Sequence, residues 1–440
     1  MKDAVVVGGG IAGLTAAWRL RDLDTILLES EPCVGGRIRS FERDGHWVSV
    51  GAHMFPGRGS FLWELLDELR LERARIHGSL LGIAYRRKIV TGGHAETFPF
   101  RLPLSPAARI SFVRAGLRIR RDAARYTELA RRAEGETESD VRRRLLGFLD
   151  DRTWAEYVGP VHPQVEAIFR ATANRLTAEP DEVAAGCMVA LFAHVWSTGG
   201  VELGFNLRNG PSSLPSELAR RLGEQVVTGA QVVEVAREAG SVRVRYLRRG
   251  REEEVSARCA IVATPAPVAR RIVLDLPAET AAALDAIVYG PFVVAGILTD
   301  ATTAWDDVYS VLTVDSSFNM LFNHSDAGGA LMVYGGAGRA RRLLAMSDDE
   351  IASTVTADLH ELYPEAHVRE VIVQRWENAI PFAAPGRARV QAALERGVDD
   401  TVFFAGDYVG EWTHMESAAL TAAEAAAAVR ARVDAPLAVS

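Results

Sequence analysis

The chain of 440 residues is poor in lysine and in cysteine. Lys2 and Lys88 are its only lysines, so nearly all of the 50 basic residues are arginine. The three cysteines, Cys33, Cys187 and Cys259, show no C-x-x-C spacing. This argues against both a zinc site and a disulfide framework, and no metal site is predicted.

Long apolar runs and a strong net charge are also missing. No stretch reaches about 18 consecutive apolar residues, so no transmembrane helix is expected. The formal net charge is -7, which gives no general attraction to nucleic acid, and we expect no such partner. The first strand begins by residue 3 or 4 and leaves no room for a signal peptide, so we expect a cytoplasmic protein.

A glycine-rich segment follows the first strand. Ala4–Val7 runs directly into Gly8-Gly9-Gly10-Ile11-Ala12-Gly13, and an alanine-rich amphipathic stretch comes next. Gly8 permits a tight turn, Gly10 lets the backbone approach a pyrophosphate, and Gly13 lets the helix pack closely on the sheet. The amides at the helix N-terminus, including those of Ile11 and Ala12, would point at the phosphates. The segment therefore predicts a dinucleotide site.

An acidic residue ends the second apolar run. Glu29 follows Thr25–Leu28, about 20 residues after the glycines, as the dinucleotide fingerprint requires. Its carboxylate can accept hydrogen bonds from both hydroxyls of the adenosine ribose and would repel a 2'-phosphate. The ligand should therefore be FAD or NAD rather than NADP, with the neighbouring Ser30 in the same site.

The block Gly35-Gly36-Arg37-Ile38-Arg39-Ser40 distinguishes FAD from NAD as the expected ligand. Together with the glycine helix and Glu29, it resembles the flavoprotein superfamily of amine oxidases, protoporphyrinogen oxidases and phytoene desaturases. In that family Gly-Gly-Arg lies along the FAD pyrophosphate, which implies this role for Gly36 and Arg37. The resemblance implies an α/β fold, in which a Rossmann-like FAD-binding domain of the glutathione-reductase type carries an inserted α+β substrate domain. The FAD-binding domain would comprise 1–80, 205–280 and 385–440, and the substrate domain 81–204 and 281–384.

Later signatures extend the resemblance over essentially the whole chain. It implies that Gly51 and Ala52 reach the N5 edge of the flavin, that Val232 or Val233 contacts adenine, and that Asp407 holds a ribityl hydroxyl. Other residues of the implied FAD site are Thr264, Trp376, Gly406, Met415, Glu416 and Ala418. No cysteine stands in the segment around Trp376, so the FAD should be non-covalent. No second glycine fingerprint follows a strand, so NAD(P)H is not the expected electron partner.

One position departs from the amine oxidases of this superfamily. They typically carry a lysine near flavin N5 where this chain has Phe292, and only Lys88 could replace it. With Phe382 and Trp412, Phe292 would line an apolar substrate site. We therefore expect hydride removal from a hydrophobic small molecule, by ring oxidation or C–C desaturation, with oxygen or another acceptor reoxidising the flavin. Amine oxidation is the first alternative, and redox-neutral isomerisation and a non-enzymatic redox sensor are further ones.

Two histidines are candidate catalytic residues. His53 follows Gly51-Ala52 and would face the site as a proton carrier or a substrate-orienting donor, or else be satisfied by backbone. His414 sits where amine oxidases place one wall of an aromatic cage. It could orient the substrate or protonate a group beside the flavin ring.

The segment between these sites is expected to be largely helical. Ser105-Pro106 marks a helix start, and the arginine-rich stretch 106–132 is either a solvated charged face or a peripheral membrane contact. Residues 83–100 predict strands around a turn at Gly92-Gly93, and 153–207 predict helices.

Overall fold

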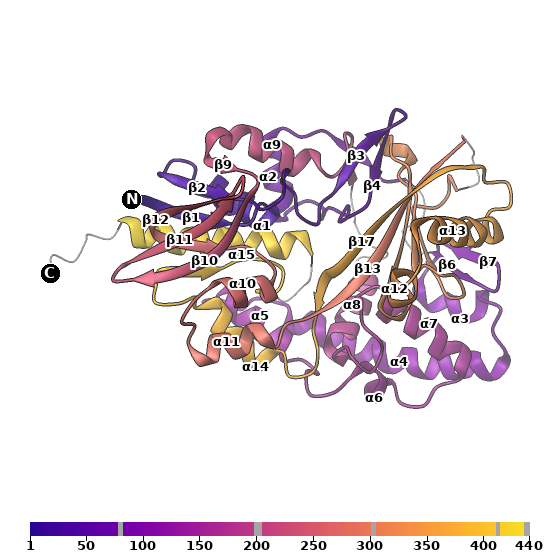
Figure 1. Cartoon of the computed structure of the whole chain (residues 1–440). Helices are drawn as coiled ribbons and strands as arrows, with labels where there is room; N and C mark the ends of the chain where they lie inside the picture. The colour runs from indigo at the N-terminus through magenta and orange to yellow at the C-terminus, as the bar shows by residue number, and fades with distance from the viewer. Residues whose placement is uncertain (78–81, 198–204, 301–304, 411–413, 435–440) are drawn as a thin grey trace.

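The computed structural model describes residues 1–77, 82–197, 205–300, 305–410 and 414–434. Two seven-stranded sheets lie side by side, each with its own helices (Figure 1). The first sheet has the order β10-β11-β12-β1-β2-β9, with β18 beside β12. Its strands are β1 (Lys2–Val7), β2 (Thr25–Leu28), β9 (Val226–Val227), β10 (Ala230–Glu238), β11 (Ser241–Arg248), β12 (Arg251–Val262) and β18 (Val402–Phe404).

Parallel pairing places the apolar strands at the centre of this sheet. β1 pairs in parallel with β2 and β12, and β12 pairs in parallel with β18. The centre of β1 is fully apolar because both of its faces are covered. Helices α1 (Ile11–Arg19) and α15 (Met415–Asp434) pack against each other on one face (Figure 1).

The second sheet has the order β17-β13-β16-β15-β14-β6-β7. Alternate residues of β13 point to opposite faces, as a period of two requires. Val293 and Ala295 pack in the core with α12 and α13, whereas Val294 belongs to the core formed with α4, α6, α7 and α8. Its strands are β6 (Gly82–Tyr85), β7 (Lys88–Thr91), β13 (Val288–Thr299), β14 (Ser310–Thr313), β15 (Met320–Phe322), β16 (Leu331–Gly336) and β17 (Val368–Phe382).

The covering helices of this half are α3 (Phe98–Arg101), α4 (Pro106–Leu129), α6 (Trp154–Val158), α7 (Pro163–Asn174), α8 (Ala185–Ser197), α12 (Ala337–Leu344) and α13 (Asp348–Leu362). The remaining helices are α2 (Phe61–Leu69), α5 (Glu138–Leu146), α9 (Ser213–Leu222), α10 (Ala266–Ile272), α11 (Ala278–Asp285) and α14 (Ala388–Glu395). Two small sheets pair β3 (Ser40–Arg43) with β4 (His46–Ser49) and β5 (Arg73–Arg75) with β8 (Phe205–Leu207). Since each large sheet collects strands from several of the predicted ranges, we retain the division into two domains as a proposal.

The structure corrects two local predictions. The β6–β7 hairpin turns at Arg86-Arg87, with φ of 51° and 60°, and not at Gly92-Gly93. Such a turn is usually made by Asn-Gly, so two arginines gave no signal. The residues after Gly93 form α3 and the short 3-10 helix at Ala95–Thr97 rather than strand. Phe205–Leu207 is strand β8 rather than helix, because it pairs with β5.

Helix α4 leaves two aliphatic side chains in solvent. Ile110 and Leu117 are 55% and 65% exposed, and the exposed Arg114 lies between them in sequence. Asp122 pairs with Arg121 and Arg125. The exposed aliphatic side chains favour lipid contact, whereas the ion pairs favour a solvated face. The structure therefore does not choose between the two interpretations of 106–132. Within the described part of the chain, no helix has the length and apolar composition needed to cross a bilayer.

Candidate active site

Four predicted cofactor residues lie just after the carboxyl ends of parallel strands. Gly8 follows β1, Glu29 follows β2, Thr264 follows β12 and Asp407 follows β18. The ends of β1, β12 and β18 are adjacent because these strands pair in register. Open α/β sheets bind ligands at this edge, so the topology alone makes it the first candidate site.

The glycine turn has the shape that the fingerprint predicts. Gly8 has a φ of +104°, which favours glycine, and a Cβ atom at Gly13 would overlap the carbonyl oxygen of Gly8. A Cβ atom at Gly10 would meet nothing within 4 Å, so the backbone is open there. The N-cap residue of α1 is Gly10, which has no side chain to cap the helix. Its first amides are therefore suited to an anionic group, as a pyrophosphate requires.

Glu29 is buried and held beside this turn. One carboxylate oxygen accepts a hydrogen bond from the amide of Gly9, and the other accepts from the amide of Glu31 at 2.7 Å and from the Ser30 hydroxyl at 3.1 Å. An ionised carboxylate offers about four lone-pair sites. Glu29 therefore keeps acceptor capacity for a donor such as a ribose hydroxyl.

The Gly-Gly-Arg block contacts the glycine turn, the segment around Ala52 and the loop of Asp407. The amide of Gly35 donates to the carbonyl of Gly9 at 2.8 Å, which lays the block over the glycine turn. Arg37 makes a bidentate ion pair with Asp407, both distances being 2.8 Å. Burial lowers the pKa of Arg37, but Asp407 outweighs it and keeps that pKa above its ordinary value. The carbonyl of Arg37 accepts from the amide of Ala52, which brings Gly51 and His53 to the same edge.

The residues present fit a bound FAD. The hydroxyl of Thr264 is buried and has no hydrogen-bond partner among the described residues, although its methyl group lies near Gly8. On strand β10 the pairing with β11 is irregular between Val232 and Glu234, so Val233 lies outside the register. Its backbone is thereby free of the ladder at the position expected to contact adenine. An orphaned polar group and an unpaired backbone segment both suit a polar nucleotide.

Aromatic side chains cluster on strands β13, β16 and β17 of the second sheet. Phe292 on β13 lies opposite Trp376 on β17, and its ring centroid is 4.6 Å from that of Tyr334. The indole of Trp376 donates to the carbonyl of Val50 at 2.7 Å, so this sheet meets the segment that precedes Gly51. Phe382, at the end of β17, is buried.

Neither lysine can serve this aromatic wall. Lys88 is exposed on β7, which is the edge strand farthest from β13 and β17 in the sheet order. Lys2 forms an ion pair with Asp24 at 2.6 Å on the first sheet. The possibility that Lys88 replaces the lysine of the amine oxidases is therefore excluded.

His53 contacts a residue that the sequence did not single out. Its Nδ1 lies 3.0 Å from Nε2 of His324, a fully buried histidine in the turn after β15. Burial lowers the pKa of His324 to about 3, and burial together with His324 lowers the pKa of His53 well below its usual range. Since no spacing links residues 53 and 324, only the fold could reveal this pair.

At the start of α15, His414 and Glu416 each cap the N-terminus of a helix. His414 is exposed, and its Nδ1 accepts a hydrogen bond from the amide of Ser417 at 3.1 Å, so the imidazole caps the helix. The carboxylate of Glu416 accepts from the amides of Phe61 and Leu62 at 2.6 and 2.9 Å and caps α2. Met415 and Ala418 are buried in the core shared with α1. Trp412 lies outside the described residues.

Helix α14 supports the loop that carries Asp407. The buried side chains of Arg387 and Gln391 donate to the carbonyls of Tyr408 and Val409. Burial lowers the pKa of Arg387 to about 10. Sequence reasoning missed this support, because Arg387 and Gln391 belong to no motif.

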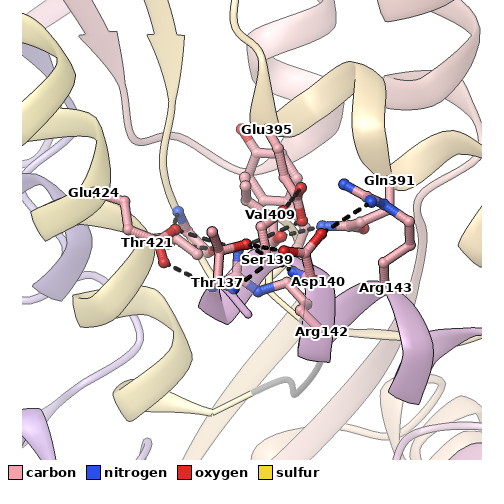
Figure 2. A network of polar contacts seen from close by, with 12 residues as sticks. Thr137, Ser139, Asp140, Arg142, Arg143, Gln391, Glu395, Val409, Thr421 and Glu424 are labelled. Atoms are coloured by element: carbon pink, nitrogen blue, oxygen red, sulfur yellow. Dashed lines mark hydrogen bonds and ion pairs between the residues drawn. The ribbon is translucent and has the colours of Figure 1, made fainter. Parts of the chain in front are cut away.

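A buried arginine connects α14 and α15 to α5, a helix that also packs against α4 and α8 of the second half. Arg142 on α5 pairs with Glu424 on α15 at 2.9 Å and with Glu395 on α14 at 3.4 Å (Figure 2). Its side chain is only 6% exposed. The network therefore holds helices of both halves together close to the loop of Asp407.

Comparison with known proteins agrees with this geometry. Residues 11–430 match the family described as flavin containing amine oxidoreductase. The coproporphyrinogen III oxidase of Mycobacterium tuberculosis H37Rv is 29% identical over 437 residues, which cover 93% of each chain. The L-amino-acid oxidase of Demansia vestigiata is 24% identical over 450 residues, covering 92% of this chain and 82% of the relative.

Solved structures share the fold. Cyclohexylamine oxidase from Brevibacterium oxydans IH-35A superposes with a TM-score of 0.78 at 18% identity, over 99% of this chain and 100% of the other. Wild-type putrescine oxidase bound to putrescine gives a TM-score of 0.74 at 20% identity, over 98% of this chain and 99% of the other. The match over nearly the whole length places this chain in the flavin containing amine oxidoreductase family, as an FAD-dependent oxidoreductase.

Proposed function

We propose that this protein oxidises the ring of a porphyrinogen, with a coproporphyrinogen as the first candidate substrate. The observation that carries the proposal is the aromatic wall of Phe292, Trp376 and Tyr334, which neither lysine can reach. The relative from M. tuberculosis, which aligns over 93% of both chains, is a coproporphyrinogen III oxidase. A flat macrocycle suits aromatic side chains, which prefer stacked or edge contacts.

The residues of the first sheet would hold the cofactor. Glu29 would accept from the ribose, the amides of α1 would face the pyrophosphate, and Asp407 would accept from the ribityl chain. Arg37 would lie along the pyrophosphate while its ion pair orients Asp407. Bound FAD supplies a two-electron acceptor for hydride, and oxygen or another acceptor would reoxidise it.

We also propose that the FAD is held without a covalent bond. Cys187 is the cysteine that contacts the segment after Phe382, through the backbone of Ala383. Burial raises the pKa of Cys187 to about 12, so its thiol is a poor nucleophile. Acid precipitation should release all of the flavin into the supernatant. Flavin retained in the pellet would contradict non-covalent binding.

Amine oxidation is the second candidate. It is favoured by the L-amino-acid oxidase relative and opposed by the lack of a lysine beside Phe292. Redox-neutral isomerisation is the third candidate, and no particular contact among the described residues favours it.

One anaerobic experiment distinguishes the three candidate reactions. FAD-loaded protein is mixed with coproporphyrinogen III, and in parallel with putrescine, cyclohexylamine and L-leucine. Conversion of a porphyrinogen to a porphyrin removes six electrons and each FAD accepts two, so at least three equivalents of FAD-loaded protein are used per porphyrinogen. We expect bleaching of the flavin band and appearance of porphyrin absorption with the porphyrinogen alone. Anaerobic conditions are needed because porphyrinogens also oxidise in air. Bleaching by an amine, or an unchanged flavin in every mixture, would overturn the proposal.

A further inference from the structure

His53 and His324 form a buried pair whose proton positions can be assigned. Nδ1 of His324 lies 3.2 Å from the carbonyl oxygen of Ala330, and Nε2 of His324 lies 3.0 Å from Nδ1 of His53. A carbonyl oxygen can only accept, so Nδ1 of His324 must carry a hydrogen. The pair is therefore a short chain of hydrogen bonds with a fixed direction.

Both rings are neutral in this environment. They pack against each other and against Phe322, with Trp47 and Tyr309 on the other sides of His324. The phenol of Tyr309 lies 3.3 Å from the amide oxygen of Asn206 and is uncharged, since burial raises its pKa. Asp326, two residues after His324, is exposed and turns to His77. No carboxylate among the described residues contacts either imidazole, so a buried positive charge would be uncompensated.

Because both imidazoles are neutral, the position of the proton between the two rings is also determined. In a neutral His324 that donates through Nδ1, Nε2 carries a lone pair and must accept. Nδ1 of His53 then supplies the hydrogen of the bond between the rings. Nε2 of His53 is left without a hydrogen, and it has no hydrogen-bond partner among the described residues. This Nδ1–H form is the less usual one for a neutral histidine.

His53 also lies where the two halves of the molecule meet. It follows Ala52, whose amide is bonded to Arg37 in the cofactor half, and its ring contacts Phe322 of the second sheet. We propose that His324 locks His53 in the Nδ1–H tautomer, so that Nε2 of His53 accepts a hydrogen bond from an N–H group of the substrate. The inference rests on the proposed function, because it places the substrate between these halves.

The assignment makes His53 an acceptor and not a proton carrier or a donor. A pyrrole N–H is the matching group on a porphyrinogen, and four such groups converge at the centre of its macrocycle. A buried neutral imidazole can orient such a donor without taking its proton. His53 is then a substrate-binding residue, and His324 is a positioning residue that acts through it.

Nitrogen-15 NMR of histidine-labelled, FAD-loaded protein at pH 7 tests the tautomer directly, with only 10 histidines to resolve. Two histidines serve as internal references. Nε2 of His360 faces the carbonyl of Ala366 at 2.8 Å, and Nδ1 of His162 accepts from the amide of Gln164, so both should show Nε2–H when neutral. We expect His53 and His324 to show Nδ1–H. An Nε2–H or a charged form of His53 would overturn the proposal.

Two variants of His324 test the lock. His324→Phe keeps an aromatic ring against Phe322 but removes the acceptor, so the resonances of His53 should move to Nε2–H. The amide oxygen of His324→Gln can restore the acceptor and should keep His53 as Nδ1–H. In turnover of coproporphyrinogen III, His324→Phe should raise KM at least fivefold and change kcat less than twofold. His324→Gln should keep both KM and kcat near the wild-type values. Equal effects of both variants would mean that His324 only fills space.

A last measurement separates this inference from the proposed function. Addition of coproporphyrin III should shift the Nε2 resonance of His53 and leave those of His162 and His360 unchanged. If the tautomer is as expected but the porphyrin shifts nothing and porphyrinogen does not bleach the flavin, the proposed substrate is wrong and the lock stands. If the porphyrinogen is oxidised but His53 does not respond, the acceptor role is wrong.

Discussion

Glu29 illustrates how much one side chain can decide at a nucleotide site. It is 7% exposed, and three donors already fix its carboxylate next to the glycine turn. A positive side chain there would lose these bonds and place a buried cation near the amides of α1. We therefore predict that Glu29→Arg abolishes tight retention of FAD.

The matched control is Glu31→Arg, because the exposed side chain of Glu31 lies two residues away and only its backbone joins the network. Absorbance at the flavin band relative to protein, measured after gel filtration, reports the retained cofactor. Yellow Glu29→Arg protein with the same ratio as Glu31→Arg would contradict the assignment.

The local elements show which signals a sequence carries. Ser105 was predicted to start a helix, and its hydroxyl accepts from the backbone amide three residues on, as that of Ser60 does at the start of α2. These caps involve residues only three apart, so the local sequence is enough to find them. The turn at Arg86-Arg87 is different, because its positive φ values are imposed by the pairing of β6 with β7 and not by the residues in the turn. Tertiary pairing outweighed local preference there.

Helix α5 carries two neighbouring arginines, one buried and one exposed, whose substitution can test how much the buried ion-pair network contributes to stability. Arg142 is 6% exposed and pairs with Glu395 and Glu424, while Arg143 is 56% exposed and pairs with Asp140 on the same helix. Removal of one partner from a buried ion pair costs about 3–5 kcal/mol, whereas an exposed pair contributes about 0–1 kcal/mol.

We therefore predict that Arg142→Ala lowers the thermal unfolding midpoint of the FAD-loaded protein by several degrees, and that Arg143→Ala leaves it within about one degree. Differential scanning calorimetry gives both midpoints. Similar midpoints for the two variants would show that the network in Figure 2 contributes little to stability.

At the scale of the whole molecule, the site divides into a part that sequence could predict and a part that it could not. The glycine turn and Glu29 lie within 30 residues and follow from spacing alone. Arg37 and Asp407 are 370 residues apart, and the family resemblance implied that both lie along the FAD but did not predict their ion pair. His324 has no motif and no fixed spacing from His53, so its contact appears only when the second sheet is in place. Long-range polar contacts of this kind leave no periodic signal in a sequence.

The buried histidine His324 predicts how the stability of the folded protein responds to acid. Folding lowers the pKa of His324 from its ordinary value of 6.5 to about 3. Below pH 6.5 the unfolded chain therefore binds a proton that the folded protein does not bind, and stability falls as the pH drops toward 3. From pH 7 to pH 5 this histidine alone should remove about 2 kcal/mol from the free energy of unfolding.

His324→Gln removes this contribution, because a glutamine does not titrate, while burial still lowers the pKa of His53 and the carboxylates are unchanged. Urea unfolding of both proteins at pH 7 and pH 5 gives the loss of stability for each. We predict that the variant loses about 2 kcal/mol less than the wild type over this interval. Parallel losses would mean that His324 is protonated at pH 5 at little cost. A ring that is buried between aromatic side chains and contacts no described carboxylate should not permit this.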